Sequence, residues 1–309
     1  MENEKKLSRR ILVPLDGSDR SLNTIRFIAD FKPFQQMEIV LFNVFHKIPE
    51  FYWDLSRDPT LRKSVAGMAA WEAQNRNDIK DFMNKGVALL KASAFKDENI
   101  TIKISTRKIG IARDIIDEAG RGYFAVATRR RGFTNIPGVL MGSVADKLMM
   151  KLSSAPVFFA GRDLPSGKIL VAVDNSIDVM NAVAFAADIT RGQDMDITLL
   201  HVIRQNEEYI YDDSPGNGES VSGEEVMAHV FKKACHKFEQ AGVKPENIHR
   251  KIISGSRSRA GTIADVALEN NHNIIFVGRH GVSKVQDFFL GRVSKKLIYA
   301  ASKKTVCIV

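Results

Sequence analysis

The chain carries one sequence pattern twice along its length. Residues 11–18 (ILVPLDGS) recur 158 positions later as residues 169–176 (ILVAVDNS). Toward the end of each copy the matches continue at a spacing of 149, as in Gly142 with Gly291. A repeat of this length is typical of a duplicated domain and not of a solenoid. Each copy therefore serves as an alignment for the other.

The length of the chain agrees with this duplication. A chain of 309 residues has an expected content of about two domains. We predict a first domain over residues 1–160, a linker over 161–166 and a second domain over 167–309. A domain of about 150 residues buries roughly 70% of its unfolded surface, so each copy is large enough to form its own core.

The composition indicates a soluble globular protein. Hydrophobic residues make up 44% of the chain and charged residues 26%, which is ordinary for this class. No apolar run approaches the ~18 residues of a membrane span, and the first residues lack the apolar core of an export signal. Only Cys235 and Cys307 are present, and we expect both as reduced thiols. These features predict a cytoplasmic protein with no membrane partner.

The basic charge does not by itself indicate nucleic-acid binding. The formal net charge is +9, yet the one dense basic run is residues 129–131. Neither a zinc-finger spacing nor a basic stripe interleaved with aromatic residues accompanies it. A solvated positive surface is the favoured interpretation, and we expect no specific nucleic-acid partner.

Apolar segments and amphipathic segments alternate along both copies. Continuous apolar runs predict strands buried on both faces, and stripes such as Leu22, Ile25 and Ala29 predict helices between them. The predicted strands are 11–15, 38–44, 100–105, 123–128 and 156–160, then 168–174, 196–202, 248–253, 273–278 and 304–309. The pattern predicts an α/β fold of two tandem doubly wound, Rossmann-like domains. A long helix is expected over residues 61–94.

The residues repeated most faithfully follow the first and fourth strands of each copy. Asp16 and Asp174 end the first strands, and a glycine-bearing loop follows each fourth strand. Ligands of such sheets bind beyond the carboxyl ends of the strands, where the strand order reverses. The alternative is that the aspartates cap the adjacent helices and that the glycines make tight turns.

In the second copy the glycine loop reads Gly278-Arg-His-Gly281, nine residues, and then Gly291-Arg292 at the start of a helix. Glycines allow a close approach of the backbone, and the start of a helix favours phosphate. The loop and the preceding aspartate resemble the universal stress protein family, specifically its tandem two-domain members. The nucleotide-binding subgroup of that family carries G-x2-G-x9-G-[ST] after its fourth strand.

The resemblance implies a five-stranded sheet of order 3-2-1-4-5 in each domain and an intramolecular pseudo-dimer formed through the fifth strands. It also implies ATP, accompanied by Mg²⁺, with adenine near the aspartate and the end of the second strand. The implied binding residues are Asp174, Val202, Gly278, Gly281 and Gly291 in the second copy, and Asp16, Val44, Gly132, Gly142 and Ser143 in the first. His280 lies inside the loop as a candidate phosphate contact, with simple exposure to solvent as the alternative.

Each copy departs from the family motif at a different position. Arg129 replaces the first glycine in the first copy, where its side chain would block the ribose. Arg292 replaces the Ser/Thr in the second copy, where a guanidinium either holds phosphate or fills the pocket. The second domain is therefore the better candidate for a nucleotide.

Three functions remain open from the sequence. The favoured hypothesis is a stress-response regulatory protein that binds an adenine nucleotide with little or no turnover. The alternative is an interaction module with vestigial pockets in a pseudo-dimeric scaffold. An enzyme, at most a slow ATPase, is the least favoured because no catalytic base or P-loop lysine is visible. No histidine spacing indicates a metal site, and further association into homodimers stays open.

Overall fold

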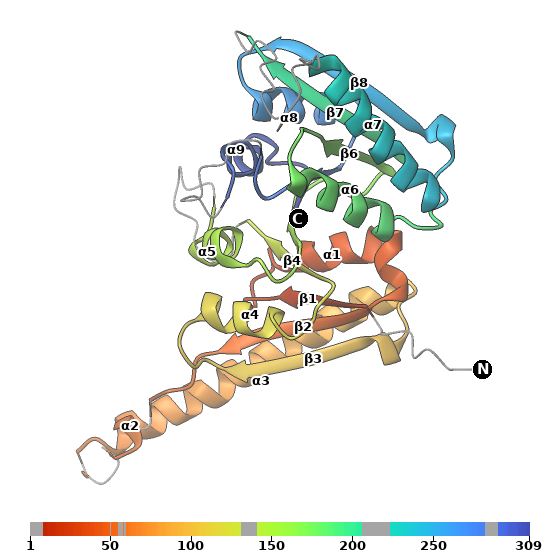
Figure 1. Cartoon of the computed structure of the whole chain (residues 1–309). Helices are drawn as coiled ribbons and strands as arrows, with labels where there is room; N and C mark the ends of the chain where they lie inside the picture. Colours follow the sequence, from red (N-terminus) through yellow and green to blue (C-terminus); the bar gives the residue numbers. More distant parts are fainter. Residues whose placement is uncertain are drawn as a thin grey trace. The chain divides into compact units, whose positions relative to one another are not determined.

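The computed structural model describes residues 9–49, 51–54, 58, 60–130, 141–205, 223–281 and 290–309 (Figure 1). Contacts within the chain divide it into two compact units, Met1–Leu148 and Met149–Val309. Both units alternate parallel strands with helices, which confirms the predicted tandem α/β fold. Gly132 and the acidic segment 206–222 lie outside the described residues.

The first unit contains four parallel strands in the order β3-β2-β1-β4. The strands are β1 (Arg10–Pro14), β2 (Glu38–Phe45), β3 (Ile100–Thr106) and β4 (Ala125–Arg129). Its helices are α1 (Leu22–Asp30), α2 (Phe51–Asp54), α3 (Arg62–Ala92), α4 (Ile111–Ala119) and the first part of α5 (Ser143–Lys151). Ile11, Leu12 and Val13 of β1 are fully buried, as expected for a strand covered on both faces.

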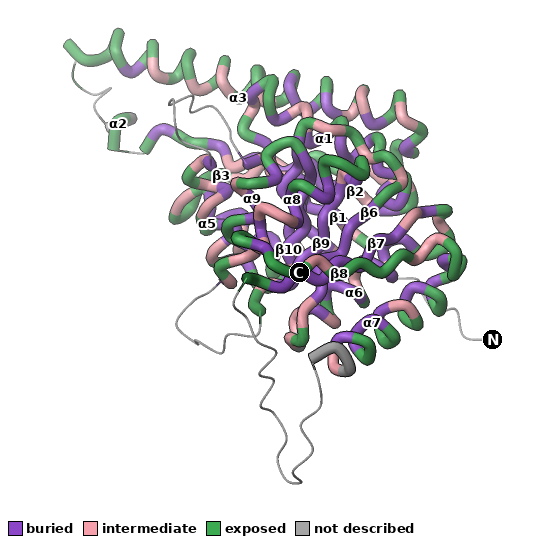
Figure 2. Tube along the Cα trace, turned by 90° about the horizontal axis from the view of Figure 1, so that it is seen from above, coloured by how far each residue is buried: buried purple, intermediate pink, exposed green. Residues whose placement is uncertain are grey.

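Helix α3 is much longer than the packing of the first unit requires. It has 31 residues, whereas α7 (Gly223–Gln240), at the matching place of the second copy, has 18. Figures 1 and 2 show that its N-terminal half runs beyond the sheet together with α2, and that this half is largely exposed. Trp71 is 57% exposed, while the buried Phe82 and Leu90 lie in the C-terminal half. The C-terminal half of α3 thus anchors the helix to the unit.

The second unit has the strand order predicted for the family fold. Its strands are β5 (Val157–Ala160), β6 (Lys168–Ala172), β7 (Asp196–Arg204), β8 (Ile248–Ser256), β9 (Ile274–Val277) and β10 (Thr305–Ile308). Strands β8-β7-β6-β9-β10 are parallel neighbours, which is the order 3-2-1-4-5. Besides α7, the unit contains α6 (Ile177–Ile189), α8 (Arg259–Glu269) and α9 (Arg292–Ala300). Helices α6 and α7 cover one face of this sheet, and α8 and α9 cover the other (Figure 1).

Strand β5 belongs by sequence to the first copy but pairs with β10 of the second. The pairing is antiparallel, with Phe158 opposite Cys307, and it confirms the predicted adjacency of the two fifth strands. The residues after β5 are also fixed to this unit, because the Lys304 ammonium lies 2.9 Å from the Asp163 carboxylate. The second compact unit therefore includes β5, which precedes the second copy of the repeated sequence.

Two general properties follow from the described residues. No helix among them is both long and apolar enough to cross a lipid bilayer. Both cysteines are free thiols; Cys307 is buried, and Cys235 is partly exposed. Burial raises the pKa of the Cys307 thiol, which makes it a poor nucleophile.

Candidate functional site

The aspartates after the first strands hold a turn in each unit. The Asp174 Oδ1 atom accepts hydrogen bonds from the Ser176 amide at 3.0 Å and from the Ser176 hydroxyl at 2.5 Å. Asp16 makes the same two bonds with Ser18, at 3.0 and 2.6 Å. In the second unit Ser176 in turn caps α6 by accepting from the Val179 amide. Asp174 therefore holds Ser176 in place, and Ser176 is the residue that caps α6.

A side chain on the second strand reaches the residue before this aspartate. His201 is buried, and its Nδ1 donates to the Val173 carbonyl at 2.8 Å. In the first unit Asn43 donates to the Leu15 carbonyl, also at 2.8 Å. Neither donor was among the site residues predicted from the sequence. The signal was present, because Asn43 and His201 are 158 positions apart and so occupy the same place in the two copies.

The Val202 carbonyl, near the end of β7, is already hydrogen-bonded within the chain. The Nε atom of Arg259 donates to it at 3.2 Å. Arg259 is the first residue of α8 and was not among the predicted site residues. The resemblance implied a backbone contact between Val202 and adenine, so the Arg259 side chain lies beside the position expected for the base.

Close contacts within the chain account for two of the loop glycines. A Cβ atom on Gly281 would lie 2.9 Å from the Asp174 carboxylate, and one on Gly278 would lie 3.0 Å from the backbone of Asp178. Both distances are tighter than ordinary side-chain contacts, so a side chain at either position would require Asp174 or Asp178 to shift. The loop therefore packs directly against the turn after β6, whether or not a ligand is bound.

Both loops are closed by the same hydrogen bond. The Gly291 amide donates to the Arg279 carbonyl at 2.8 Å, and the Gly142 amide donates to the Arg130 carbonyl at 2.6 Å. Gly291 then precedes α9, whose N-terminus has no side-chain cap. Its first amide groups and the helix dipole favour an anion at this position.

His280 is turned toward α6. Its main-chain amide and its Nδ1 atom both lie within hydrogen-bonding distance of Asp178 Oδ2, at 2.9 and 2.8 Å. Asp178 lies in the first turn of α6, where a carboxylate is stabilised by the helix dipole. His280, which the sequence offered as a candidate phosphate contact, thus contacts a carboxylate of the chain through both its amide and its ring.

Arg279 binds the end of a helix. Its guanidinium donates to the carbonyls of Met149 and Leu152, at the C-terminus of α5, where cations are favourable. Burial lowers the pKa of Arg279. Arg130, at the matching position of the first copy, is also buried; burial and the neighbouring Arg129 lower its pKa to about 10. Arg279 is therefore a structural residue of the glycine loop.

One cavity of about 340 Å³ lies at the carboxyl ends of β6, β7 and β9. It brings together all seven residues predicted for the second copy: Asp174, Val202, Gly278, His280, Gly281, Gly291 and Arg292. Among the described residues, four cations line it, namely Arg204, Arg259, Arg292 and Lys296. Apolar side chains such as Val179, Leu200 and Ile263 form the rest of the wall. The cavity is thus part apolar and part cationic.

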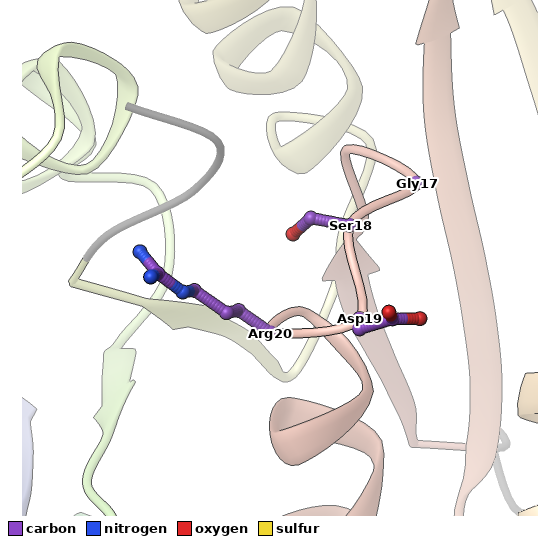
Figure 3. Close-up of a pocket in the computed structure, with 4 residues that line it drawn as sticks. All are labelled: Gly17, Ser18, Asp19 and Arg20. Carbon is purple, nitrogen blue, oxygen red and sulfur yellow. The ribbon is translucent and has the colours of Figure 1, made fainter. Parts of the chain in front are cut away.

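The first unit presents a different cavity, of about 290 Å³, beside the turn after β1. Its lining is residues 17–20 (Figure 3). The Ser18 hydroxyl and the Arg20 guanidinium point to the same side, whereas the Asp19 carboxylate points away (Figure 3). Of the residues predicted for this copy, Asp16, Val44, Gly142 and Ser143 are described and none of them lines this cavity, and Gly132 is outside the described part.

The sequence profile of the universal stress protein family matches residues 8–158 and again residues 165–309. The chain belongs to the universal stress protein family. Its fold resembles that of a universal stress protein from Archaeoglobus fulgidus DSM 4304, with 19% identity, 98% coverage of both chains and a TM-score of 0.64. It also resembles a functionally unknown protein from Pseudomonas aeruginosa PAO1, with 15% identity, coverage of 98% of this chain and 92% of the other, and a TM-score of 0.53.

At these identities the two structures show the fold alone. A search of curated proteins returned no match. Within the described ranges, no three His, Cys, Asp or Glu side chains are grouped so that they could hold a metal ion. The chemistry of the site therefore depends on the residues that line the cavity of the second unit.

Proposed function

We propose that this universal stress protein binds ATP or a related adenine nucleotide in the cavity of its second unit, and that occupancy of the cavity is a regulatory signal. The observation that carries this proposal is the lining of one cavity by all seven predicted residues and four cations. A volume of about 340 Å³ lies within the range of small-molecule sites.

The two kinds of wall suit the two parts of a nucleotide. The apolar side chains Val179, Leu200 and Ile263 offer a surface for a purine ring. Arg292 and Lys296 lie in α9, beside the glycine loop, and guanidinium groups bind phosphate as a fork. The amides at the start of α9 add to this attraction.

A comparison of the two copies supports the second unit over the first. Near the third strands the two copies align at an offset of 148, because residues 98–100 and 246–248 have the same sequence. At this offset the first residue of α4 aligns with the first residue of α8. The first copy has His46 for Arg204, Ile111 for Arg259 and Ser143 for Arg292, whereas Lys147 matches Lys296. Three of the four cations are therefore absent from the matching positions of the first copy.

Magnesium would enter with the nucleotide. Asp174 is the one carboxylate among the described residues that line the cavity. Mg²⁺ in nucleotide sites is commonly held by one or two carboxylates together with phosphate oxygens and water. The residues present fit an ion that is bound mainly through the phosphates.

An interaction module without a nucleotide is the second candidate. The Val202 carbonyl and the His280 amide are already hydrogen-bonded within the chain. Side chains in place of Gly278 and Gly281 would be crowded by Asp178 and Asp174 of the chain itself. These observations explain the motif residues without a ligand.

Purified full-length protein distinguishes the two candidates. We expect nucleotide to be released on denaturation, and the melting temperature to rise when ATP and Mg²⁺ are added. Arg292→Ser, which installs the residue of the first copy, should weaken binding about tenfold or more because a charged hydrogen bond is lost. Arg250→Ser on β8, outside the cavity, removes the same charge and should have little effect. Absence of both release and thermal shift would leave the interaction module.

A further inference from the structure

The N-terminal half of α3 projects beyond the sheet that the rest of the helix covers (Figures 1 and 2). One side of this half contacts the chain. The Glu72 carboxylate accepts a hydrogen bond from the Ile48 amide at 2.9 Å, and the Arg76 guanidinium lies over the Phe45 ring, 5.1 Å from its centroid. The opposite side of the helix faces outward.

A continuous line of exposed residues runs along this outward side. Its members are three or four positions apart, so they lie on one face of the helix. The same spacing allows the side chains of two helices to interlock. We call this line the α3 surface, and all of its residues are exposed: Lys63, Gly67, Ala70, Gln74, Asp78 and Asp81. Trp71 borders it and is 57% exposed.

The charges of the α3 surface are divided between its two ends. Lys63 lies at the N-terminal end, whereas Asp78 and Asp81 lie at the C-terminal end. A twofold rotation about an axis midway along the surface places Lys63 of each copy opposite Asp81 of the other. A parallel arrangement would instead place like charges opposite each other, which is unfavourable. The surface is therefore complementary in charge to an antiparallel copy of itself.

The middle of the α3 surface favours a close contact between helices. Lys63 and Asp81 are each nine positions from residue 72, so the rotation axis passes beside Trp71. The short side chains of Gly67 and Ala70 allow the two helix axes to approach each other. The Trp71 ring adds apolar area next to the axis, and tryptophans near the centre of an interface contribute strongly to affinity. The charges at the ends and the apolar centre thus agree on one axis.

We propose that the α3 surface binds the same surface of a second copy of this chain, and that the two helices form an antiparallel pair about a twofold axis beside Trp71. Each contact then occurs twice in the dimer. The inference is independent of the proposed nucleotide site, because α3 belongs to the first unit and the cavity to the second.

Analytical ultracentrifugation of the full-length protein tests this inference by charge exchange. We expect a dimer whose population rises with protein concentration. Lys63→Asp should weaken it about tenfold or more, because two attractive pairs become repulsive. The double variant Lys63→Asp/Asp81→Lys restores opposite charges and should return the dissociation constant to within about threefold of its original value. Lys80→Asp is the control, because Lys80 is exposed on the same helix but lies outside the α3 surface.

Trp71→Ala tests the centre of the proposed interface. The ring is exposed within one chain, so the variant should keep its fold, as circular dichroism can check, and its dimer should be at least about tenfold weaker. A chain that stays monomeric at every concentration would overturn the inference. A dimer that is insensitive to Lys63→Asp and Trp71→Ala, or one that the double charge exchange fails to restore, would overturn it as well.

Discussion

At the scale of single residues, the two copies use different side chains for one hydrogen bond. Asn43 donates to the Leu15 carbonyl, and His201 donates to the Val173 carbonyl, each at 2.8 Å. Both donors are buried, so each satisfies a polar group that would otherwise be costly to bury. The position requires a short side chain with an N–H group and does not require a histidine.

This equivalence predicts the outcome of two substitutions at His201. His201→Asn should leave the free energy of unfolding nearly unchanged, because the first copy uses asparagine at this place. His201→Ala should lower it by about 1–3 kcal/mol, because the carbonyl loses its buried partner. Urea unfolding of both variants measures the difference. Equal stability of the two variants would show that the hydrogen bond is unimportant.

We expect His272 to make the stability of the second unit depend on pH. The ring is buried, and its Nε2 atom lies 2.8 Å from the Thr198 hydroxyl. Burial lowers the pKa of His272 below its ordinary value of about 6.5. His272 therefore binds a proton more readily in the unfolded chain than in the folded chain. Because acid then favours the unfolded state, the free energy of unfolding falls as the pH drops below about 6.5.

Replacing His272 should flatten this dependence. We expect the melting temperature of the unchanged protein to fall more between pH 7.5 and pH 5.5 than that of His272→Gln. The difference between the two proteins isolates the histidine from other acid-sensitive groups. Parallel melting curves for both proteins would contradict this role.

At the scale of elements, the pairing of β5 could be predicted before the structure was known, whereas individual side-chain contacts could not. The order of elements and the repeat predicted the parallel sheet, and the resemblance implied the pairing of the fifth strands. The sequence did not predict that Arg259 would bind Val202 or that Asp178 would bind His280. These pairs are 57 and 102 positions apart, and each depends on which way an interfacial side chain turns once the elements have packed.

The pairing of β5 with β10 predicts a large effect at Phe158. Its ring is fully buried and lies 5.9 Å from the ring of Phe276. Phe158→Ala should lower the free energy of unfolding by about 3–5 kcal/mol because it leaves a cavity. Phe51, which is 66% exposed, provides the matched control, and Phe51→Ala should be nearly neutral. A small effect at Phe158 would mean that this strand pair contributes little to the unit.

At the glycine loop we predict a substitution that strengthens ATP binding, in contrast to Arg292→Ser. Asp178 binds the His280 amide and places a negative charge beside the loop. Asp178→Ala frees that amide and removes the charge, so ATP affinity should rise roughly three- to tenfold. Titration calorimetry measures the change. Unchanged or weaker binding would show that this amide does not face the phosphate.

At the scale of the whole molecule, duplication has produced two similar folds with unlike sites. The β strands match in order, and the turns after β1 and β6 have the same hydrogen bonds. The cations Arg204, Arg259 and Arg292 occur only in the second copy at these matched positions. The proposed nucleotide site therefore belongs to the second copy alone.

The stoichiometry of ATP binding to the full-length protein, measured by calorimetry, tests this account most directly. We predict one nucleotide per chain, with binding weakened by Arg292→Ser and unaffected by Ser143→Ala at the matching position of the first copy. Two equivalent sites per chain, or a single site that is lost with Ser143→Ala and retained with Arg292→Ser, would contradict it.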